Sequence, residues 1–298
     1  MQIVKIKIPG GEIVEYESGI SIRTVLEQHN LNSNDKPLIA VKLNNRITSI
    51  ASTINYNCKI EPIELGSTDG LRIYRRSLSF LLEMASREIF PDLRLKISHS
   101  IGSSIYYYFE DRNKINEKDL KRLYDKMKEI VERKYSIDIM KVAYEEAIEV
   151  FKDFNQPETL LLLKGMNNPY LTINKCNNFI AMSFTPLVDN TSTLNYFEIM
   201  KYHNGFLLRY PGSKNPREIL PFEDRPLLYS IYEEYSGWGK ILNVNCVGQM
   251  NNLTTKKKEI QHFIRVSESL HNKKIAQIAD EILQRKGDVK VVLIAGPS

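Results

Sequence analysis

The chain has 298 residues, of which 42% are hydrophobic, so it can bury the cores of two or more domains. Its formal net charge of +5 is too dilute over this length to be the dense basic patch of a dedicated nucleic-acid binder. Three widely spaced cysteines exclude a disulfide framework and a zinc ribbon, and no run approaches the ~18 apolar residues of a membrane span. We therefore expect a cytoplasmic protein with free thiols, no membrane partner and no metal site.

Residues 1–65 read as a small β-rich domain. Gly10-Gly11 is a hairpin-turn signal between two strands of alternating residues, and Ser21 is a candidate N-cap of a short helix. The apolar run at 38–43 predicts a buried strand, with a turn at Asn44-Asn45. The order of two strands, a helix and two or more strands predicts a β-grasp fold.

Residues 66–222 read as an α+β domain. A helix is expected at 77–89, because its leucines recur at helical spacing, and Pro91 ends it. Two strands are expected around Gly102. Further helices are expected at 120–131, 140–151 and 158–164, and further strands at 170–173, 179–182, 194–201 and 205–209.

Residues 223–287 read as a helical connector. They are expected to form a helix at 227–236, a strand at 242–247 and a long helix at 258–286, which the polar residues 271–274 could divide. The apolar run that follows is typical of a central parallel strand covered on both faces. We therefore interpret 288–298 as the first strand of a further α/β domain.

The last three residues, Gly296, Pro297 and Ser298, follow this strand as the start of a phosphate-binding loop would. The full motif is G-x-x-x-x-G-K-[ST], in which backbone N–H groups and the Lys bind phosphate and the hydroxyl holds Mg²⁺. Only the first Gly and two further positions are in the sequence. A strand followed by Gly-Pro is also simply a turn, and these residues alone would not transfer a phosphoryl group.

The C-terminal region resembles a nucleotide-binding enzyme family. The segments RVSESLHNKKIAQIADEILQRKG (265–287) and VKVVLIAGPS (289–298) are similar to the junction before the kinase domain of bacterial uridine-kinase-like proteins, in the phosphoribulokinase/uridine kinase family. This resemblance implies a parent kinase that uses ATP and Mg²⁺ to phosphorylate the 5′-hydroxyl of a nucleoside such as uridine or cytidine. The present chain would be its regulatory or ligand-binding part, truncated at the start of the P-loop domain.

The first two domains resemble parts of threonyl-tRNA synthetase. Residues 1–65 resemble its TGS domain, a β-grasp module. The segments RRSLSFLLEMASREIFPDLRLKISHSIGSSIYYYFE (75–110) and KCNNFIAMSFTPLVDNTSTLNYFEIMKYHNGFLLRYP (175–211) resemble its second N-terminal domain, which edits mischarged tRNA. The implied order is a TGS domain, an editing-like α+β domain, a helical linker and the first strand of an α/β kinase domain.

The resemblance also locates a degenerate editing site. The editing pattern is H-x-x-x-H on the first helix and C-x-x-x-H later, and it falls on Arg76, Phe80, Cys176 and Ile180. Arg, Phe and Ile side chains neither relay protons nor bind metal as His does. Editing activity is therefore expected to be lost, with Cys176 a small buried residue.

A second group of residues suggests a surviving cleft. His99 and Ser100 form a pair that looks typical of the kinase subgroup, and with Cys176 and Arg209 they could line such a cleft. The alternative is that His99 only makes a hydrogen bond in a β-turn. The run Tyr106–Tyr108 could stack bases, but neighbouring strand residues face opposite ways, so core on one face and rim on the other is favoured.

Three functions are compatible with these patterns. The first is the regulatory arm of a nucleoside kinase, with ATP, Mg²⁺ and a nucleoside as partners of the full-length protein. The alternative is an RNA-, tRNA- or nucleotide-binding module derived from threonyl-tRNA synthetase. The third is a residual hydrolase of aminoacyl esters.

Overall fold

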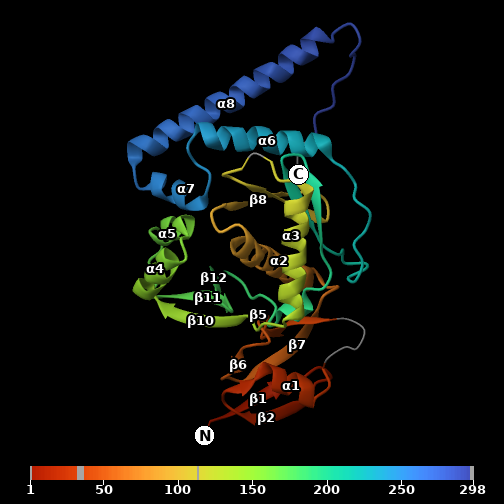
Figure 1. Ribbon diagram of the computed structural model, residues 1–298, viewed down its shortest axis with the longest axis vertical. Helices are drawn as coiled ribbons and strands as arrows, with labels where there is room; N and C mark the ends of the chain where they lie inside the picture. Colours follow the sequence, from red (N-terminus) through yellow and green to blue (C-terminus); the bar gives the residue numbers. More distant parts are fainter. Residues whose placement is uncertain (1, 32–36, 113, 296–298) are drawn as a thin grey trace. The chain divides into compact units, whose positions relative to one another are not determined.

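The computed structural model describes residues 2–31, 37–112 and 114–295, so Gly296, Pro297 and Ser298 lie outside the described residues. Two compact units make up the chain. The first comprises Met1–Ala147 and Asn168–Leu228, and the second Ile148–Asn167 and Tyr229–Ser298. Together they have the mixed α+β character expected from the sequence (Figure 1).

The N-terminal part of the first unit has a small two-stranded sheet, β3-β6, one helix and a mixed sheet of five strands. The strand order of the five-stranded sheet is β2-β1-β7-β4-β5, in which β1 and β7 run parallel and the other neighbours antiparallel. Asn44 and Asn45 both have positive φ, as the predicted turn between β4 and β5 requires. The elements are β1 (Ile3–Lys7), β2 (Ile13–Glu17), β3 (Ile20–Ser21), α1 (Ile22–Gln28), β4 (Leu38–Leu43), β5 (Arg46–Thr48), β6 (Thr53–Ile54) and β7 (Cys58–Glu64).

Helix α2 (Thr68–Ile89) starts nine residues before the predicted start at 77. The Ser67 Oγ accepts a hydrogen bond from the Gly70 N–H at 3.0 Å, which satisfies one of the free donors of the first turn. The added turns bury Ile73 and Tyr74. Three arginines among these residues hide the apolar stripe in the sequence, which explains the late predicted start.

The β-grasp sheet and α2 share one hydrophobic core. Ile39 and Ala40 of β4, with Ile63 and Leu65, belong to the same buried cluster as Leu78 of α2. Lys42 of β4 forms an ion pair with Asp69 of α2 at 2.7 Å, and Arg23 of α1 forms one with Asp189, which precedes η1 (Thr191–Thr193). The five-stranded sheet is therefore packed into the first unit by apolar contacts as well as by the chain connection.

Two further sheets complete the first unit. One has the order β13-β14-β9-β8 and the other β10-β11-β12, and α2 packs against α3 (Figure 1). The expected helix at 140–151 is partly wrong, because residues up to Ala143 pair with β11, and the expected strand at 194–201 begins at Glu198. The elements are β8 (Leu95–Ser100), β9 (Ser104–Phe109), α3 (Glu117–Glu132), β10 (Asp138–Ala143), the start of α4 (Tyr144–Asp153), which from Ile148 belongs to the second unit, β11 (Tyr170–Cys176), β12 (Phe179–Met182), the 3-10 turn η1 (Thr191–Thr193), β13 (Glu198–Tyr202) and β14 (Gly205–Arg209).

The second unit is helical, with α5 (Pro157–Leu163), most of α6 (Pro226–Ile241), α7 (Val247–Thr254) and α8 (Lys257–Gln284). The expected strand at 242–247 is wrong: a turn leads directly into α7. Helix α8 also runs unbroken through the polar residues 271–274.

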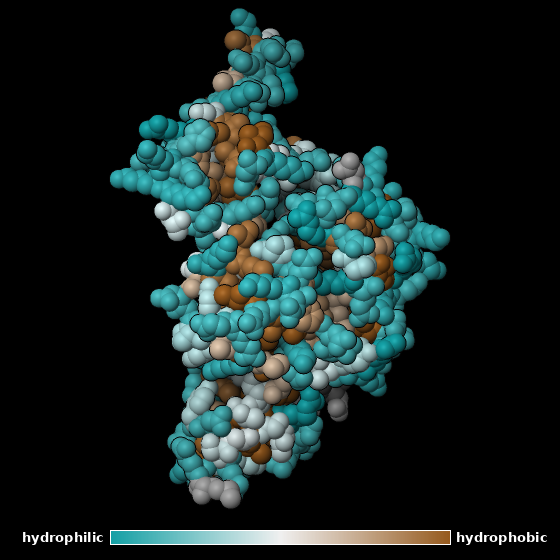
Figure 2. Space-filling view, turned by 60° about the vertical axis from the view of Figure 1, so that its left-hand side comes forward, coloured by the Kyte–Doolittle hydropathy of each residue, from teal (hydrophilic) through white to brown (hydrophobic). Residues whose placement is uncertain are grey.

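The apolar run at 289–295 forms no strand, which corrects the expected parallel strand. Its side chains are exposed, because it has no sheet partner among the described residues. Exposed apolar side chains also occur on α6 and α8, among them Ile231 and Ile278. Figure 2 shows hydrophobic residues gathered in the upper part of the view. No helix within the described ranges is long and apolar enough to cross a membrane.

Candidate functional site

The residues at the editing-like positions meet where α2 faces the sheet of β10, β11 and β12. Arg76, Phe80, Glu83 and Arg87 recur along one side of α2 at helical spacing. Phe179 of β12 lies opposite this side of α2. Its ring contacts that of Phe80, with centroids 4.9 Å apart, and the Arg87 guanidinium lies 5.8 Å from the centre of the same Phe179 ring. We call this side of α2 and the strand face opposite it the α2–β11 face.

An apolar contact fills one end of the α2–β11 face. Cys176 is paired with Phe179 across β11 and β12, and its side chain is fully buried in the core that includes Phe80. Burial, assisted by the nearby carboxylates of Asp138 and Glu88, raises the pKa of the Cys176 thiol to about 12. A thiol with this pKa is protonated at neutral pH and is a poor nucleophile.

Ile180 does not belong to the same face as Cys176. It is paired with Lys175, one residue before Cys176, and successive strand residues point to opposite faces of a sheet. Its side chain is therefore directed away from α2. Of the four predicted positions, only Arg76, Phe80 and Cys176 lie on the α2–β11 face.

The other end of the α2–β11 face is polar and exposed. The Lys141 ammonium of β10 lies 5.0 Å from the centre of the Tyr170 ring of β11. Beyond β12, the Ser183 N–H donates to the Thr172 carbonyl at 2.9 Å, which keeps the chain beside β11. Two residues later, the Thr185 hydroxyl accepts a hydrogen bond from Arg76 Nη1 at 2.8 Å. We call this group the open end of the α2–β11 face.

Asn174 lies between the two ends. It is opposite Ala181 and shares a strand face with Thr172 and Cys176. Its side chain is buried, yet no group in the described ranges donates a hydrogen bond to its Oδ1.

Glu83 is a carboxylate within this otherwise cationic and aromatic stripe of α2. Surrounding protein atoms raise its pKa by burial, and Arg87, whose Nη2 lies 3.3 Å from Glu83 Oε1, opposes the shift.

No family model matches the chain. It is 28% identical over 199 residues to the threonine–tRNA ligase of Francisella tularensis subsp. tularensis (strain FSC 198), and equally to that of subsp. novicida (strain U112). In each case the match covers 67% of this chain and 31% of the relative. The chain is similar to threonine–tRNA ligases. It spans about a third of the length of these relatives.

The likeness to threonine–tRNA ligases supports the resemblance to the synthetase modules. It overturns the kinase assignment made from the C-terminal segments, because the relatives are named tRNA ligases and not kinases. The structure agrees with this correction at one point: the apolar run at 289–295 does not form the strand that was expected to open a kinase domain.

The second predicted group, His99, Ser100 and Arg209, is not part of the synthetase-like α2–β11 face. Arg209 forms an ion pair with Glu198 and donates to the Leu220 carbonyl. It is paired with Ser104 across β14 and β9, and so shares a sheet face with Tyr106.

The opposite face of the same sheet carries Tyr107, which donates a hydrogen bond to Ser79 of α2 at 2.7 Å. The face with Tyr106 is therefore turned away from α2, and the predicted cleft with Cys176 is not assembled. His99 lies on β8 with its ring 5.5 Å from that of Tyr106, and burial lowers its pKa. The alternation predicted for the tyrosine run is confirmed, since Tyr106 and Tyr108 stack on one face.

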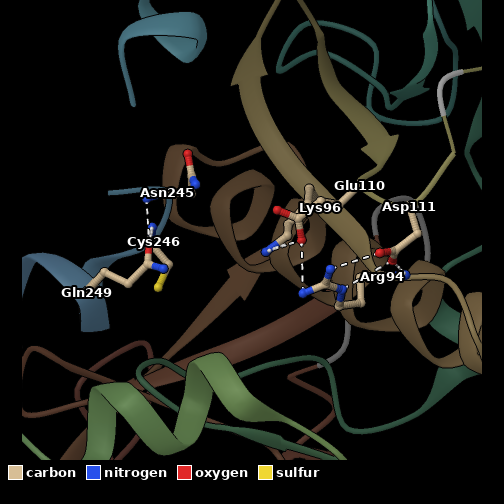
Figure 3. Close-up of polar contacts among 7 residues, drawn as sticks. All are labelled: Arg94, Lys96, Glu110, Asp111, Asn245, Cys246 and Gln249. Carbon is tan, nitrogen blue, oxygen red and sulfur yellow. Dashed lines mark hydrogen bonds and ion pairs between the residues drawn. The ribbon is translucent and has the colours of Figure 1, made fainter. Parts of the chain in front are cut away.

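Two groups of polar contacts outside the α2–β11 face were not predicted from the sequence (Figure 3). Arg94 of β8 contacts Asp111 at 2.8 Å and Glu110 at 3.3 Å, and it lowers the pKa of Asp111 to about 2. At the start of α7, the Asn245 and Cys246 N–H groups donate to Gln249 Oε1 at 2.6 and 3.2 Å. The spacing of Cys246 and Gln249 is that of a capping box, with Cys in place of the usual Ser or Thr. These contacts stabilise a strand end and a helix start.

Proposed function

We propose that this chain is an RNA-binding module of threonyl-tRNA synthetase origin that has lost the editing reaction. The proposal depends on one observation: the α2–β11 face is closed by the contact between Phe80 and Phe179 where the editing residues are expected, and is cationic at its other end. The names of the relatives support RNA as the ligand, because those enzymes act on tRNA.

None of the four predicted editing positions carries a group suited to hydrolysis. A nucleophile requires an accessible thiolate or a water activated by a base. Cys176 is buried and protonated, and two of the expected imidazoles are replaced by an arginine and a phenylalanine. The fourth position, Ile180, is apolar and faces the other way. The face is therefore suited to binding without turnover.

The proposal is tested by titrating the chain with tRNA at two salt concentrations. Binding through phosphate contacts must weaken as salt rises, with a linear dependence of log K on log[salt]. A parallel assay follows the deacylation of aminoacyl-tRNA with and without the Cys176→Ala substitution. No binding at low salt would reject the RNA-binding function, and deacylation that depends on Cys176 would reject the loss of editing.

A further inference from the structure

One exposed side of helix α8 carries a regular stripe of side chains (Figure 1). Its positions recur in alternating steps of four and three residues, which is the spacing of the a and d positions of a coiled coil. Every side chain of this set is exposed, and the last one belongs to the residue that caps the helix. We call the set the α8 stripe; it consists of Ile264, Glu268, His271, Ile275, Ile278, Ile282 and Arg285.

The α8 stripe is not the side by which the helix packs within its own unit. Phe263, Leu270 and Lys274 occupy the neighbouring side of α8 and are only partly exposed, and Lys274 forms an ion pair with Glu234 of α6 at 2.8 Å. On the stripe, by contrast, Ile275 is 53% exposed. A single exposed isoleucine needs no explanation, but a row of them bordered by polar residues marks an interaction surface.

The charges of the α8 stripe determine which partner fits it. Three isoleucines occupy its middle, whereas Glu268 lies toward one end and Arg285 at the other. Within the part of the chain that the structure describes, neither of these two side chains forms an ion pair. A stripe with an acid at one end and a base at the other is complementary to a reversed copy of itself.

A single antiparallel register brings the opposite charges together at both ends. In an antiparallel pair of helices, each a position of one helix faces a d position of the other. When Glu268 faces Arg285 of the second copy, the remaining layers are fixed, and they pair Ile275 with Ile278 and His271 with Ile282. The isoleucines therefore meet around the two-fold axis. A parallel pairing would place the two acids together and the two bases together, which is unfavourable.

The charges beside the α8 stripe leave this choice unchanged. In the antiparallel register, Lys274 would face Glu281 of the second copy, and Arg265 would face Lys286. One of these contacts is attractive and the other repulsive, so together they add little. The acid and the base on the stripe itself remain the groups that select the orientation.

We propose that the α8 stripe is a self-association surface, by which two copies of this chain pair their α8 helices antiparallel, with Glu268 of each copy beside Arg285 of the other. Such an interface is isologous, because the same patch serves both copies. The stripe covers roughly 32 Å of helix at 1.5 Å per residue, which is the length of three heptads. This inference is independent of the RNA-binding function proposed above.

Sedimentation equilibrium of the full chain at increasing concentrations tests the proposal. We expect the mean mass to rise from 34.5 kDa toward twice that value, because a dimer is favoured by mass action. Ile278→Asp should raise the dissociation constant about a hundredfold or more, since each dimer contains two substituted layers. Leu283→Asp is the matched control: Leu283 is 62% exposed on the same helix but lies outside the stripe, so this variant should dimerise like the parent.

Exchange of the two charges tests the register. Glu268→Arg and Arg285→Glu should each weaken the dimer about tenfold, because like charges then meet at both ends of the interface. The double variant Glu268→Arg, Arg285→Glu should restore the affinity of the parent. A merely structural role of either side chain would not produce this rescue.

Disulfide trapping tests the orientation in a Cys246→Ala background, because Cys246 is a partly buried native cysteine and the other two are buried. Two variants are prepared, one with Glu268→Cys and one with Arg285→Cys. On oxidation, the antiparallel register should link the two variants to each other when they are mixed, and should link neither variant to itself.

Each result supports or overturns the proposal. A parent chain that stays monomeric at every concentration would reject self-association, including the case in which the stripe binds a different protein. A dimer that persists in Ile278→Asp, with helix content unchanged by circular dichroism, would place the interface elsewhere. If Ile278→Asp loses helix content, the charge variants decide instead, and failure of the double exchange to restore affinity would reject the antiparallel register.

Discussion

Burial determines the chemistry of the cysteines at the residue scale. Cys176 and Cys58 are enclosed by apolar side chains, and burial raises the pKa of both thiols. Cys246 at the start of α7 is only partly buried. The residue that looked most like a nucleophile in the sequence is therefore chemically the most protected.

Thiol labelling of the native chain should follow this order. We expect rapid reaction of Cys246 with a small disulfide reagent, and reaction of Cys58 and Cys176 only when the chain unfolds, because the thiolate is the reactive form. Mass spectrometry of the labelled peptides measures the order. The Cys246→Ala variant should show no rapid phase, and rapid labelling of Cys176 in the folded state would contradict the prediction.

Glu83 should make stability depend on pH in the opposite sense to a surface carboxylate. The pKa of Glu83 is raised in the folded chain. Its favourable contribution to the free energy of unfolding is therefore present below the pKa of Glu in the unfolded chain, near 4.3, and is lost as pH rises through the pKa of Glu83 in the folded chain. Glu83→Gln should therefore raise the melting temperature at pH 7, and this gain should vanish near pH 3.5.

Glu129 of α3 is the control for Glu83, because its cationic partners shift its pKa in the opposite direction. A hydrogen bond from Lys126, assisted by Arg133, lowers the pKa of Glu129. Its contribution is present at neutral pH and is lost as pH falls through the lowered pKa. Glu129→Gln should thus lower the melting temperature at pH 7. The same sign of change for both variants would contradict the assignment.

At the scale of elements, the pairing of β14 with β9 depends on a glycine. A Cβ at Gly205 would lie 2.1 Å from the Tyr107 carbonyl oxygen and 2.9 Å from the Tyr106 ring. The two strands could accept a methyl group there only by moving apart, which would disturb the contacts of Tyr107 with Phe206 and α2.

Gly205→Ala should therefore destabilise the chain by roughly 3 kcal/mol or more, as a substitution with backbone overlap does. Gly212→Ala is the control, because a Cβ there meets nothing within 4 Å and should change stability by less than about 0.5 kcal/mol. Denaturant unfolding measures both. Equal stability of the two variants would show that the strands adjust without cost.

The elements that could be predicted from the sequence are those specified by local signals. The hairpin turn at Asn44-Asn45 and the helix around 120–131 were found because turn residues and apolar spacing act over a few positions. Strand β10 was taken for the start of a helix, since its six residues lead directly into α4. That error hid Lys141 and Tyr170 as neighbours, so the open end of the α2–β11 face was not anticipated.

At the scale of the whole molecule, the β-grasp sheet and the editing-like part behave as one unit. The apolar residues that join them come from β4, the end of β7 and α2, far apart in sequence. Such contacts leave no local signal, so patterns within short sequence windows do not reveal them.

Leu65→Ala tests this coupling, because the leucine is fully buried in the shared core. A cavity of this kind costs ~2–5 kcal/mol. We expect faster hydrogen exchange in β4 and in α2 together, measured by mass spectrometry of their peptides. Faster exchange confined to the β-grasp strands would show that the two parts open independently. Val4→Ala, in the separate core of the β-grasp part, provides the comparison.

The direction of Ile180 has a consequence for any attempt to rebuild the editing pattern on this face. Histidines could return at positions 76 and 80 by substitution, but a histidine at 180 would still point away from them, since β11 pairs Ile180 with Lys175. Bringing it round requires a one-residue shift of strand register, which would turn every side chain of β12 over at once. Point substitutions at positions 76, 80 and 180 alone would therefore not place three histidines together on the α2–β11 face.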